Sequence, residues 1–276
     1  MIDLHTHSSA SDGSLSPSQL VALASERGLK ALALTDHDTL GGLAEAEAAS
    51  AGRPDLRFIR GIEIEIAFDP GEFHLLGLGI GDADGELAAA AAGLSRARDE
   101  RNRRILERAR SAGIDLSMEE LREAAGGGAA GRPHIAALLV SRKAVRTRQE
   151  AFDRYLGKGR PWYEPKGCLE LPEAIRLVKG SGALVVAAHP LSLFVSWGRL
   201  ASIMDEWKEI GIDGVEAYHP AAKVGQCRRL ERMARERGFL VTAGSDFHGS
   251  LRPERKLGRT AGNLEIADRY LDDLGI

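Results

Sequence analysis

Residues 2–7 read Ile2-Asp3-Leu4-His5-Thr6-His7, a short apolar segment that runs into two histidines. Residues 31–38 repeat the arrangement as Ala31-Leu32-Ala33-Leu34-Thr35-Asp36-His37-Asp38. Between them lies a predicted helix that starts at Ser16-Pro17, with serine as N-cap and proline in the first turn, and ends at Gly28. Strand, helix and strand in this order predict a mainly parallel α/β fold with polar side chains at its strand ends.

The same alternation continues along most of the chain. Short aliphatic segments predict strands, and longer segments with capping signals predict helices. The expected strands are residues 2–5, 31–35, 57–67, 73–80, 183–188, 212–218 and 239–244. The expected helices are residues 16–28, 40–51, 171–180, 198–210 and 221–237.

Residues 86–166 interrupt this alternation, because they are rich in Ala, Arg, Glu and Leu and contain no convincing strand. We therefore predict a barrel formed by residues 1–85 and 167–276, with a helical insertion at 86–166. From Arg96 to Lys166 there are 17 Lys and Arg against 10 Asp and Glu, a balance of +7, so with a total of −3 the rest carries −10. Solvated arginine-rich helix faces would explain this asymmetry. A cationic cap that attracts phosphorylated substrates to an acidic metal site would also explain it.

Composition excludes several classes of protein. The chain has 276 residues, of which 43% are hydrophobic and 28% charged, as in ordinary globular proteins rather than disordered or membrane ones. No apolar run approaches the roughly 20 residues that a membrane-spanning helix needs, and the N-terminal residues do not resemble a signal peptide. The two cysteines, Cys168 and Cys227, are too few for a disulfide framework. We expect a soluble, cytoplasmic protein that does not bind membranes.

Seven of the eight histidines, together with several acids, follow or lie in predicted strands. Residues two apart on an extended segment point to the same side, so His5 with His7, and Asp246 with His248, can each converge on one ion. A lone histidine at a strand end is usually a packing residue, but this constellation has no economical structural explanation. Imidazole with carboxylate suits Mn, Fe or Zn, and the lack of cysteine argues against a structural zinc site.

Four motifs together resemble those of the PHP (polymerase and histidinol phosphatase) phosphoesterases of the amidohydrolase superfamily. They are Asp3-Leu4-His5-Thr6-His7, Thr35-Asp36-His37-Asp38, Ala188-His189-Pro190 and Ser245-Asp246-Phe247-His248. The resemblance implies a distorted (β/α)7 barrel that holds two or three divalent ions, with Mn²⁺ expected and Zn²⁺ or Fe²⁺ as alternatives.

The resemblance also implies a set of metal ligands. One ion would be held by His5, His7, Glu63 and Asp246. A second would share Glu63 with His74 and His189, and a third would be held by Asp12, His37 and His248. Asp12 departs from several family members, which place a histidine there, and an aspartate in Ser11-Asp12-Gly13 is also a typical turn residue.

Within the family, the chain looks most like a subgroup whose helical insertion carries Gly131-Arg132-Pro133-His134 and a segment similar to residues 155–163. That subgroup includes 3′,5′-nucleotide bisphosphate phosphatases and 5′→3′ exoribonucleases. The resemblance implies that Arg132, His134, Lys158 and Arg160 bind substrate phosphate. Exposed surface charge is the alternative interpretation of these side chains. Trp162, Tyr163 or Phe247 could stack on a base or could simply pack.

In the mechanism that the resemblance implies, a hydroxide bridging two ions attacks phosphorus. Asp246 would accept a proton, and His134 or His219 would contact phosphate or protonate the leaving oxygen. Ser8, next to His7, is a further candidate for substrate contact. Asp36, Asp38 and Glu65 could orient the histidines, although Glu65 could equally be a solvated strand residue.

The leading function is hydrolysis of the 3′-phosphate of a 3′,5′-bisphosphonucleoside, which turns pAp into AMP and phosphate. The first alternative is 5′→3′ exoribonuclease activity on short 5′-phosphorylated RNA. The second is hydrolysis of C–N bonds, which superfamily membership alone would permit, and the third is a non-catalytic metal-binding module. The expected partner is therefore a small phosphorylated nucleotide, with short RNA as the alternative, and the sequence gives no signal for an oligomeric state.

Overall fold

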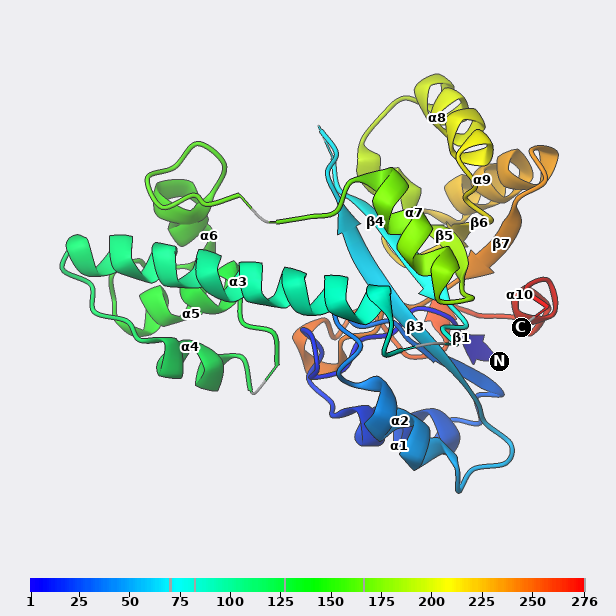
Figure 1. Cartoon of the computed structure of the whole chain (residues 1–276), viewed down its shortest axis with the longest axis horizontal. Helices are drawn as coiled ribbons and strands as arrows, with labels where there is room; N and C mark the ends of the chain where they lie inside the picture. The colour runs from blue at the N-terminus through cyan, green and yellow to red at the C-terminus, as the bar shows by residue number, and fades with distance from the viewer. Residues whose placement is uncertain (70, 82, 127, 166, 276) are drawn as a thin grey trace. The chain divides into compact units, whose positions relative to one another are not determined.

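A computed structural model describes residues 1–69, 71–81, 83–126, 128–165 and 167–275. A seven-stranded sheet that curls into a nearly closed barrel forms the centre of the larger part of the chain (Figure 1). Its strands follow one another in chain order: β1 (Ile2–Asp3), β2 (Ala31–Leu34), β3 (Arg57–Ile66), β4 (Phe73–Leu78), β5 (Leu184–Ala188), β6 (Gly214–Tyr218) and β7 (Leu240–Ala243). The expected strands and the α/β barrel are confirmed.

One strand, β4, runs antiparallel to both of its neighbours, while the other neighbouring pairs are parallel. Only six residues separate Ile66 from Phe73. A parallel crossover needs about a dozen or more residues, so a link this short allows only an antiparallel hairpin. The reversed strand is what distorts this barrel relative to an all-parallel one.

The barrel closes through residues just past its first and last strands. Thr6 and Phe247 form a parallel bridge, in which His7 N donates to Phe247 O at 2.9 Å and Asp246 N donates to His5 O at 2.9 Å. Buried Asp3 strengthens the closure, because its carboxylate accepts hydrogen bonds from Ser245 N, Ser245 Oγ and Gly258 N at 3.0, 2.5 and 2.7 Å. Burial raises the pKa of Asp3 to about 6, and these hydrogen bonds oppose the rise.

Helices cover the outside of the barrel (Figure 1). They are α1 (Pro17–Glu26), α2 (Leu43–Ser50), α7 (Leu171–Gly180), α8 (Trp197–Glu209), α9 (Val224–Glu236) and α10 (Arg269–Asp272). The predicted capping of α1 is confirmed: Gln19 N donates to Ser16 Oγ, the Gln19 side chain accepts from Ser16 N, and Gly28 follows with φ of 68°. The helix buries Leu20 and Val21 against the sheet, which fixes the α1 segment beside β2.

Residues Ala92–Gly167 form a second compact unit, separate from the unit of Met1–Ala91 and Cys168–Ile276. It contains most of α3 (Glu86–Ser111), then α4 (Met118–Ala124), α5 (Arg132–Ser141), α6 (Arg148–Ala151) and the π-helical turn η1 (Phe152–Leu156). These helices have their own core, which includes Ile105, Leu121, Ile135, Leu139 and Trp162. The expected end of the insertion, Lys166, lies outside the described residues, and the boundary 86–166 stays a prediction.

The remaining elements are short. They are the 3₁₀ turns η2 (Pro190–Leu193), η3 (Gly249–Leu251) and η4 (Ala261–Asn263) and the hairpin of β8 (Arg259–Thr260) and β9 (Leu264–Glu265), which the sequence did not predict. Among the helices of the described residues, none combines the length and hydropathy that crossing a membrane requires.

Candidate metal centre

The strands deliver the predicted ligands to one rim of the barrel. His5 and His7 follow β1, His37 follows β2, His189 follows β5, and Asp246 with His248 follows β7. Glu63 lies within β3, beside His37. His74 is the second residue of β4 rather than its end, and the antiparallel direction of that strand brings it to the same rim.

Glu63 is the centre of the arrangement, 1% exposed and deep in the rim. Five imidazole rings place a nitrogen within 3.3 Å of one of its oxygens, and they belong to His5, His7, His37, His74 and His189. Oε1 faces His74 and His189, whereas Oε2 faces the other three. Burial raises the pKa of Glu63, but the facing histidines hold it well below its usual value. A carboxylate with its two oxygens in two groups of imidazoles is suited to bridge two cations.

Asp246 lies between ligand histidines and a further histidine. Its Oδ1 is 3.1 Å from His7 Nε2 and 3.7 Å from His5 Nε2, while its Oδ2 is 3.0 Å from His219 Nε2. Its backbone has φ of 49°, a left-handed conformation that costs a non-glycine residue energy and recurs at functional sites. His189 shares this property, with φ of 29°.

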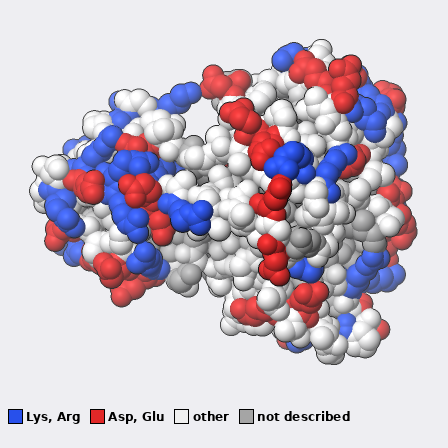
Figure 2. Space-filling view, in the orientation of Figure 1, with Lys and Arg blue, Asp and Glu red and all other residues white. Residues whose placement is uncertain are grey.

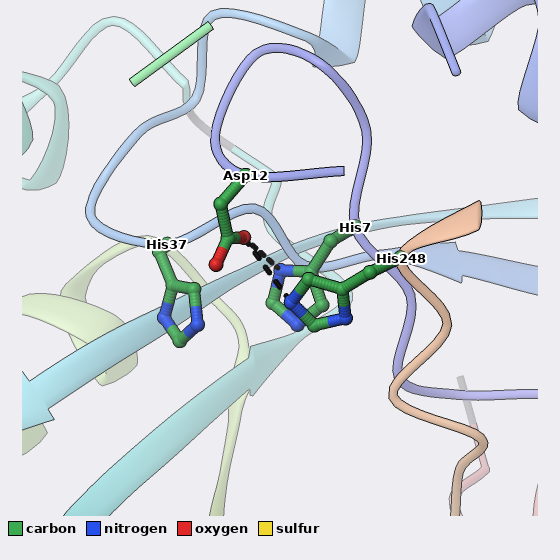
Figure 3. Close-up of side chains that lie close together, drawn as sticks. All are labelled: His7, Asp12, His37 and His248. Carbon is green, nitrogen blue, oxygen red and sulfur yellow. Dashed lines mark ion pairs between the residues drawn. The ribbon is translucent and has the colours of Figure 1, made fainter. Parts of the chain in front are cut away.

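Asp12 points into a third group, formed with His7, His37 and His248 (Figure 3). Its Oδ1 lies 3.2 Å from His248 Nε2 and 3.8 Å from His7 Nδ1. The loop that carries Asp12 is held by Asp36, which accepts hydrogen bonds from Ser8 N, Ser8 Oγ and Ser11 Oγ. Asp36 therefore fixes the position of this loop rather than orienting a histidine.

The structure brings all nine predicted metal ligands together. Their atoms form four overlapping groups, each with members within 4.8 Å of one another: His7, Asp12, His37 and His248; His5, Glu63 and His189; His5, His7 and Asp246; and His37, Glu63 and His74. His7 joins the group of Asp12, which the ligand sets implied by the resemblance did not include. Which ion each group holds stays a prediction.

The chemistry of the groups fits divalent cations. His5 Nε2 and His7 Nε2 face each other at 3.1 Å, as two ligands of one ion would. His7 Nδ1, Glu63 Oε2 and His248 Nε2 are buried and make no hydrogen bond within the described residues. Burial lowers the pKa of His5, but Glu216 and Glu63 raise it to about 10, which shows how strongly the carboxylates here attract positive charge. Metal binding would displace that proton.

Glu216 orients His5, a role that sequence reasoning missed. Its Oε1 lies 3.0 Å from His5 Nδ1, which leaves His5 Nε2 for the cluster, and its Oε2 accepts from His189 N at 2.9 Å. The register of β6 shifts between Glu216 and Tyr218. A β-carbon on Gly244 would lie 2.2 Å from His5 Cβ and 2.6 Å from Glu216 Oε1, so only glycine fits there. The available signal in the sequence was that Glu216 lies in the predicted strand that comes directly after the strand preceding His189.

A cavity of about 420 Å³ opens beside the cluster. One wall is formed by ligands such as Glu63 and His189, and apolar side chains such as Leu230 form another part. His219 also lines this cavity, as do two arginines from the segment after β7, Arg252 and Arg255. Neither arginine was predicted to be functional, because nothing in the sequence distinguishes them from surface charge.

The predicted phosphate-binding residues of the insertion lie in the second compact unit of the chain, Ala92–Gly167. Arg132 begins α5, donates to Leu156 O at 3.4 Å and has its guanidinium 5.5 Å from the centre of the Tyr163 ring. His134 Nδ1 accepts from Gly131 N at 3.2 Å, so this histidine caps its own helix. The α5 start therefore lies against the segment that carries Lys158 and Arg160. Whether these four side chains bind substrate stays a prediction.

Two of the suggested stacking aromatics are packing groups instead. Trp162 is buried and stacks on Tyr155 with ring centres 4.1 Å apart, and Phe247 is buried in the barrel. Ser8 is also buried, and its hydroxyl donates to Asp36 and accepts from Ala10 N, so it serves the loop. Substrate contact by Ser8 stays a prediction.

Comparison with known proteins agrees with this geometry. The family model of the PHP domain matches residues 3–155, more than half of the chain. The chain belongs to the PHP-domain family. The predicted ligands that follow β1 and β2 and those on β3 and β4 all lie within that match, so the predicted family is confirmed.

This PHP-domain protein has relatives with named activities. It is 32% identical over 260 residues to a 3′,5′-nucleoside bisphosphate phosphatase of Chromobacterium violaceum, covering 94% of this chain and 91% of that protein. It is 33% identical over 246 residues to a 5′-3′ exoribonuclease of Haemophilus influenzae, covering 89% of each. A solved structure from Bifidobacterium adolescentis, named for metal-dependent phosphoesterase activity, matches with a TM-score of 0.81 and 31% identity over 99% of this chain and 94% of that one. The protein is a metal-dependent phosphoesterase of the PHP-domain family.

Proposed function

We propose that this PHP-domain protein removes the 3′-phosphate of 3′,5′-bisphosphonucleosides, converting pAp to AMP and inorganic phosphate. The observation that carries the proposal is the surface formed within the insertion unit by the start of α5 and the segment 157–163. There Arg132 lies over Tyr163 and reaches the Leu156 carbonyl. A cationic group of this kind suits a second, uncleaved phosphate. The relative from Chromobacterium violaceum supports the same substrate class.

Divalent ions in this cluster would lower the pKa of a water molecule and neutralise charge on the phosphoryl oxygens. His5, His7, His37, His74, His189 and His248, with Asp12, Glu63 and Asp246, would hold them. We propose Mn²⁺ as the ion, with Zn²⁺ or Fe²⁺ as alternatives that suit the same mixture of imidazole and carboxylate. The cysteines Cys168 and Cys227 form no disulfide, which fits a cytoplasmic enzyme.

Asp246 is the proposed proton acceptor. One of its oxygens faces His7 and the other faces His219, so the carboxylate is held at the edge of the cluster where it meets the cavity. A base must lie within hydrogen-bond reach of the proton that it takes, and Asp246 belongs to the cluster and also lines the cavity.

His219 is best suited to orient Asp246. Its Nδ1 accepts a hydrogen bond from Ala221 N at 3.2 Å, so in the neutral ring the proton is on Nε2, which donates to Asp246 Oδ2 at 3.0 Å. Burial holds the pKa of His219 well below its usual value, which keeps the ring neutral near pH 7. A neutral imidazole already committed to Asp246 is a poor general acid, so we propose a positioning role.

Exoribonuclease activity is the second candidate, because the relative from Haemophilus influenzae is named a 5′-3′ exoribonuclease and matches a similar share of this chain. The same cluster could hydrolyse a diester, in which the leaving group is the same 3′ oxygen but the phosphorus also carries the next nucleotide. Hydrolysis of C–N bonds has less support, since arginines such as Arg132 suit phosphate rather than an amide.

The test is phosphate release by Mn²⁺-loaded protein from pAp, pGp, 5′-AMP and 3′-AMP, run beside degradation of a 5′-phosphorylated trinucleotide. The proposal expects turnover of pAp and pGp at least about tenfold more efficient than that of either monophosphate, because one charge-assisted phosphate contact contributes about 1.5–3 kcal/mol. Degradation of the trinucleotide without release of phosphate from pAp would select the exoribonuclease. Equal turnover of pAp and the monophosphates would contradict the anchoring role of the second phosphate.

A further inference from the structure

Arg255 is a largely buried arginine at the edge of the metal cluster. Its side chain is 13% exposed, and it lines the cavity together with Glu63, His189 and His219. Its Nη1 forms an ion pair with Asp246 Oδ2 and lies 3.3 Å from Asp246 O. Arg252 approaches the same carboxylate from the more exposed side, with Nη1 3.9 Å from Asp246 Oδ2. Two guanidinium groups thus converge on one ligand carboxylate.

With divalent cations bound in the cluster, the positive charges of Arg255 and Arg252 would no longer be neutralised. A guanidinium is positively charged at any pH at which a protein folds. The nearby carboxylates Asp246 and Glu63 are both members of the candidate metal groups. Bound cations would neutralise the negative charge of these carboxylates, which faces Arg255. Two arginines beside divalent cations repel them unless an anion lies between. A phosphoryl group is such an anion.

Arg255 also has donors left for a ligand. Within the described residues its hydrogen bond and its closest ion pair both use Nη1, and the partner in each case is Asp246. A guanidinium has five N–H donors in a planar fork that matches two oxygens of a phosphate. The remaining donors belong to a side chain that lines the cavity, where an ester bound to the cluster would place its phosphoryl oxygens.

We propose that Arg255, assisted by Arg252, binds the nonbridging oxygens of the phosphoryl group that is hydrolysed. This inference rests on phosphoester hydrolysis at the cluster, and it deepens the proposed function by assigning the residue that holds the reacting phosphate, as distinct from the anchoring phosphate assigned to Arg132. In the reaction, water provides the oxygen of the new P–O bond, the ester P–O bond breaks, and the leaving alkoxide receives a proton. The charge on the nonbridging oxygens persists throughout, and the Arg255 fork neutralises part of it.

A structural role is the competing explanation, because Arg255 could serve only to orient Asp246 as a metal ligand. The two roles differ in what a substitution removes. Loss of a phosphate contact weakens phosphate binding and leaves the metal in place. Loss of an orienting contact weakens metal binding and leaves the affinity of the fully loaded protein for phosphate unchanged.

The experiment measures the dissociation constant of inorganic phosphate by calorimetry and the Mn²⁺ content per chain by elemental analysis, for wild type and for Arg255→Met, Arg255→Lys and Arg252→Gln. Arg259→Gln is the matched control, since Arg259 lies in the same part of the chain but pairs with Glu265 at 2.9 Å and does not line the cavity. Thermal unfolding checks that each variant is folded, and Arg255→Lys, which retains charge, is the fallback if the methionine variant is not.

We expect Arg255→Met to weaken phosphate binding by about ten- to a hundredfold, the size of a lost charge-assisted contact, with unchanged Mn²⁺ content. Arg255→Lys should lose about tenfold, because it keeps the charge without the fork. Arg252→Gln should lose less, and the control nothing. Lower Mn²⁺ content with unchanged phosphate affinity at saturating Mn²⁺ would overturn the proposal, as would no change in either quantity.

The outcome is independent of which nucleotide is cleaved. Inorganic phosphate is the probe, so a wild-type protein that binds phosphate but ignores pAp would refute the proposed substrate and leave the test of Arg255 intact. A wild-type protein that cleaves pAp while Arg255→Met binds phosphate normally would refute the assignment of Arg255 alone.

Discussion

The barrel unit and the insertion unit both concentrate charged side chains, but they hold them differently. In the barrel, histidines and carboxylates converge on Glu63 from the strands and from the loops that follow them. In the insertion, arginines lie on helix faces, and Figure 2 shows Lys and Arg interspersed with Asp and Glu over its visible surface. Many are paired, such as Arg142 with Glu120 and Arg154 with Glu150. Buried convergence identifies a site, whereas surface charge by itself does not.

Removal of divalent ions should have the largest effect, and it should destabilise the barrel unit while leaving the stability of the insertion unit unchanged. A chelator should abolish hydrolysis and lower the stability of the barrel by about 4 kcal/mol for each ion present at a thousand times its dissociation constant. The core of the insertion contains none of the nine ligands. Trp162 lies in that core, so a Trp197→Phe, Trp207→Phe variant reports its unfolding by fluorescence. An equal shift of the Trp162 transition and of barrel circular dichroism would mean that the units unfold together.

Glu63→Gln should have the next largest effect, because it removes the charge that faces five histidines. We expect activity to fall more than about a hundredfold, since losing a supporting partner of a metal ligand already costs 10- to 100-fold. Mn²⁺ content should fall as well. Glu45→Gln is the control, an exposed glutamate whose contact is with Ser18 N. Full metal content and activity in Glu63→Gln would show that the convergence of the barrel side chains is not a metal site.

Asp12→Ala should reduce activity by about tenfold to a hundredfold and remove about one ion per chain, whereas Asp12→His should restore most of both, because imidazole provides an equivalent ligand atom. Asp55→Ala, at an exposed turn, is the control. Elemental analysis at limiting Mn²⁺ provides the ion count. If Asp12→Ala keeps its ions and its rate, the aspartate is only a turn residue.

Arg132→Ala should have the smallest effect, and it should change only the binding of substrate. We expect KM for pAp to rise about tenfold, the size of one lost charge-assisted contact, with metal content and hydrolysis of p-nitrophenyl phosphate unchanged. Arg142→Ala is matched to it, since Arg142 ends the same helix α5 and pairs with Glu120. Equal effects of the two substitutions would mean that the charge of the insertion acts only as a general field.

The sequence predicted the barrel well, because each strand is a short aliphatic segment and each ligand stands next to one. It placed His74 as the second residue of a strand at 73–80, as the structure does, but it did not predict that this strand is reversed. The six-residue link before Phe73 was the overlooked signal for the reversal. Glu216 was not predicted to orient His5, because the two are 211 residues apart in the chain. Arg255 lies nine residues from Asp246, but the sequence does not distinguish it from surface charge. The contact of Glu216 with His5 depends on tertiary closure rather than on local pattern.

The closure of the barrel between Thr6 and Phe247 also determines when the protein can acquire its ions during synthesis. His5 and His7 leave the ribosome some 240 residues before Asp246 and His248. At about 5–20 residues per second, that interval is on the order of ten to fifty seconds. Until β7 and the residues after it have been made, a nascent chain presents an incomplete set of the proposed ligands. Metal loading would therefore be a late step of maturation.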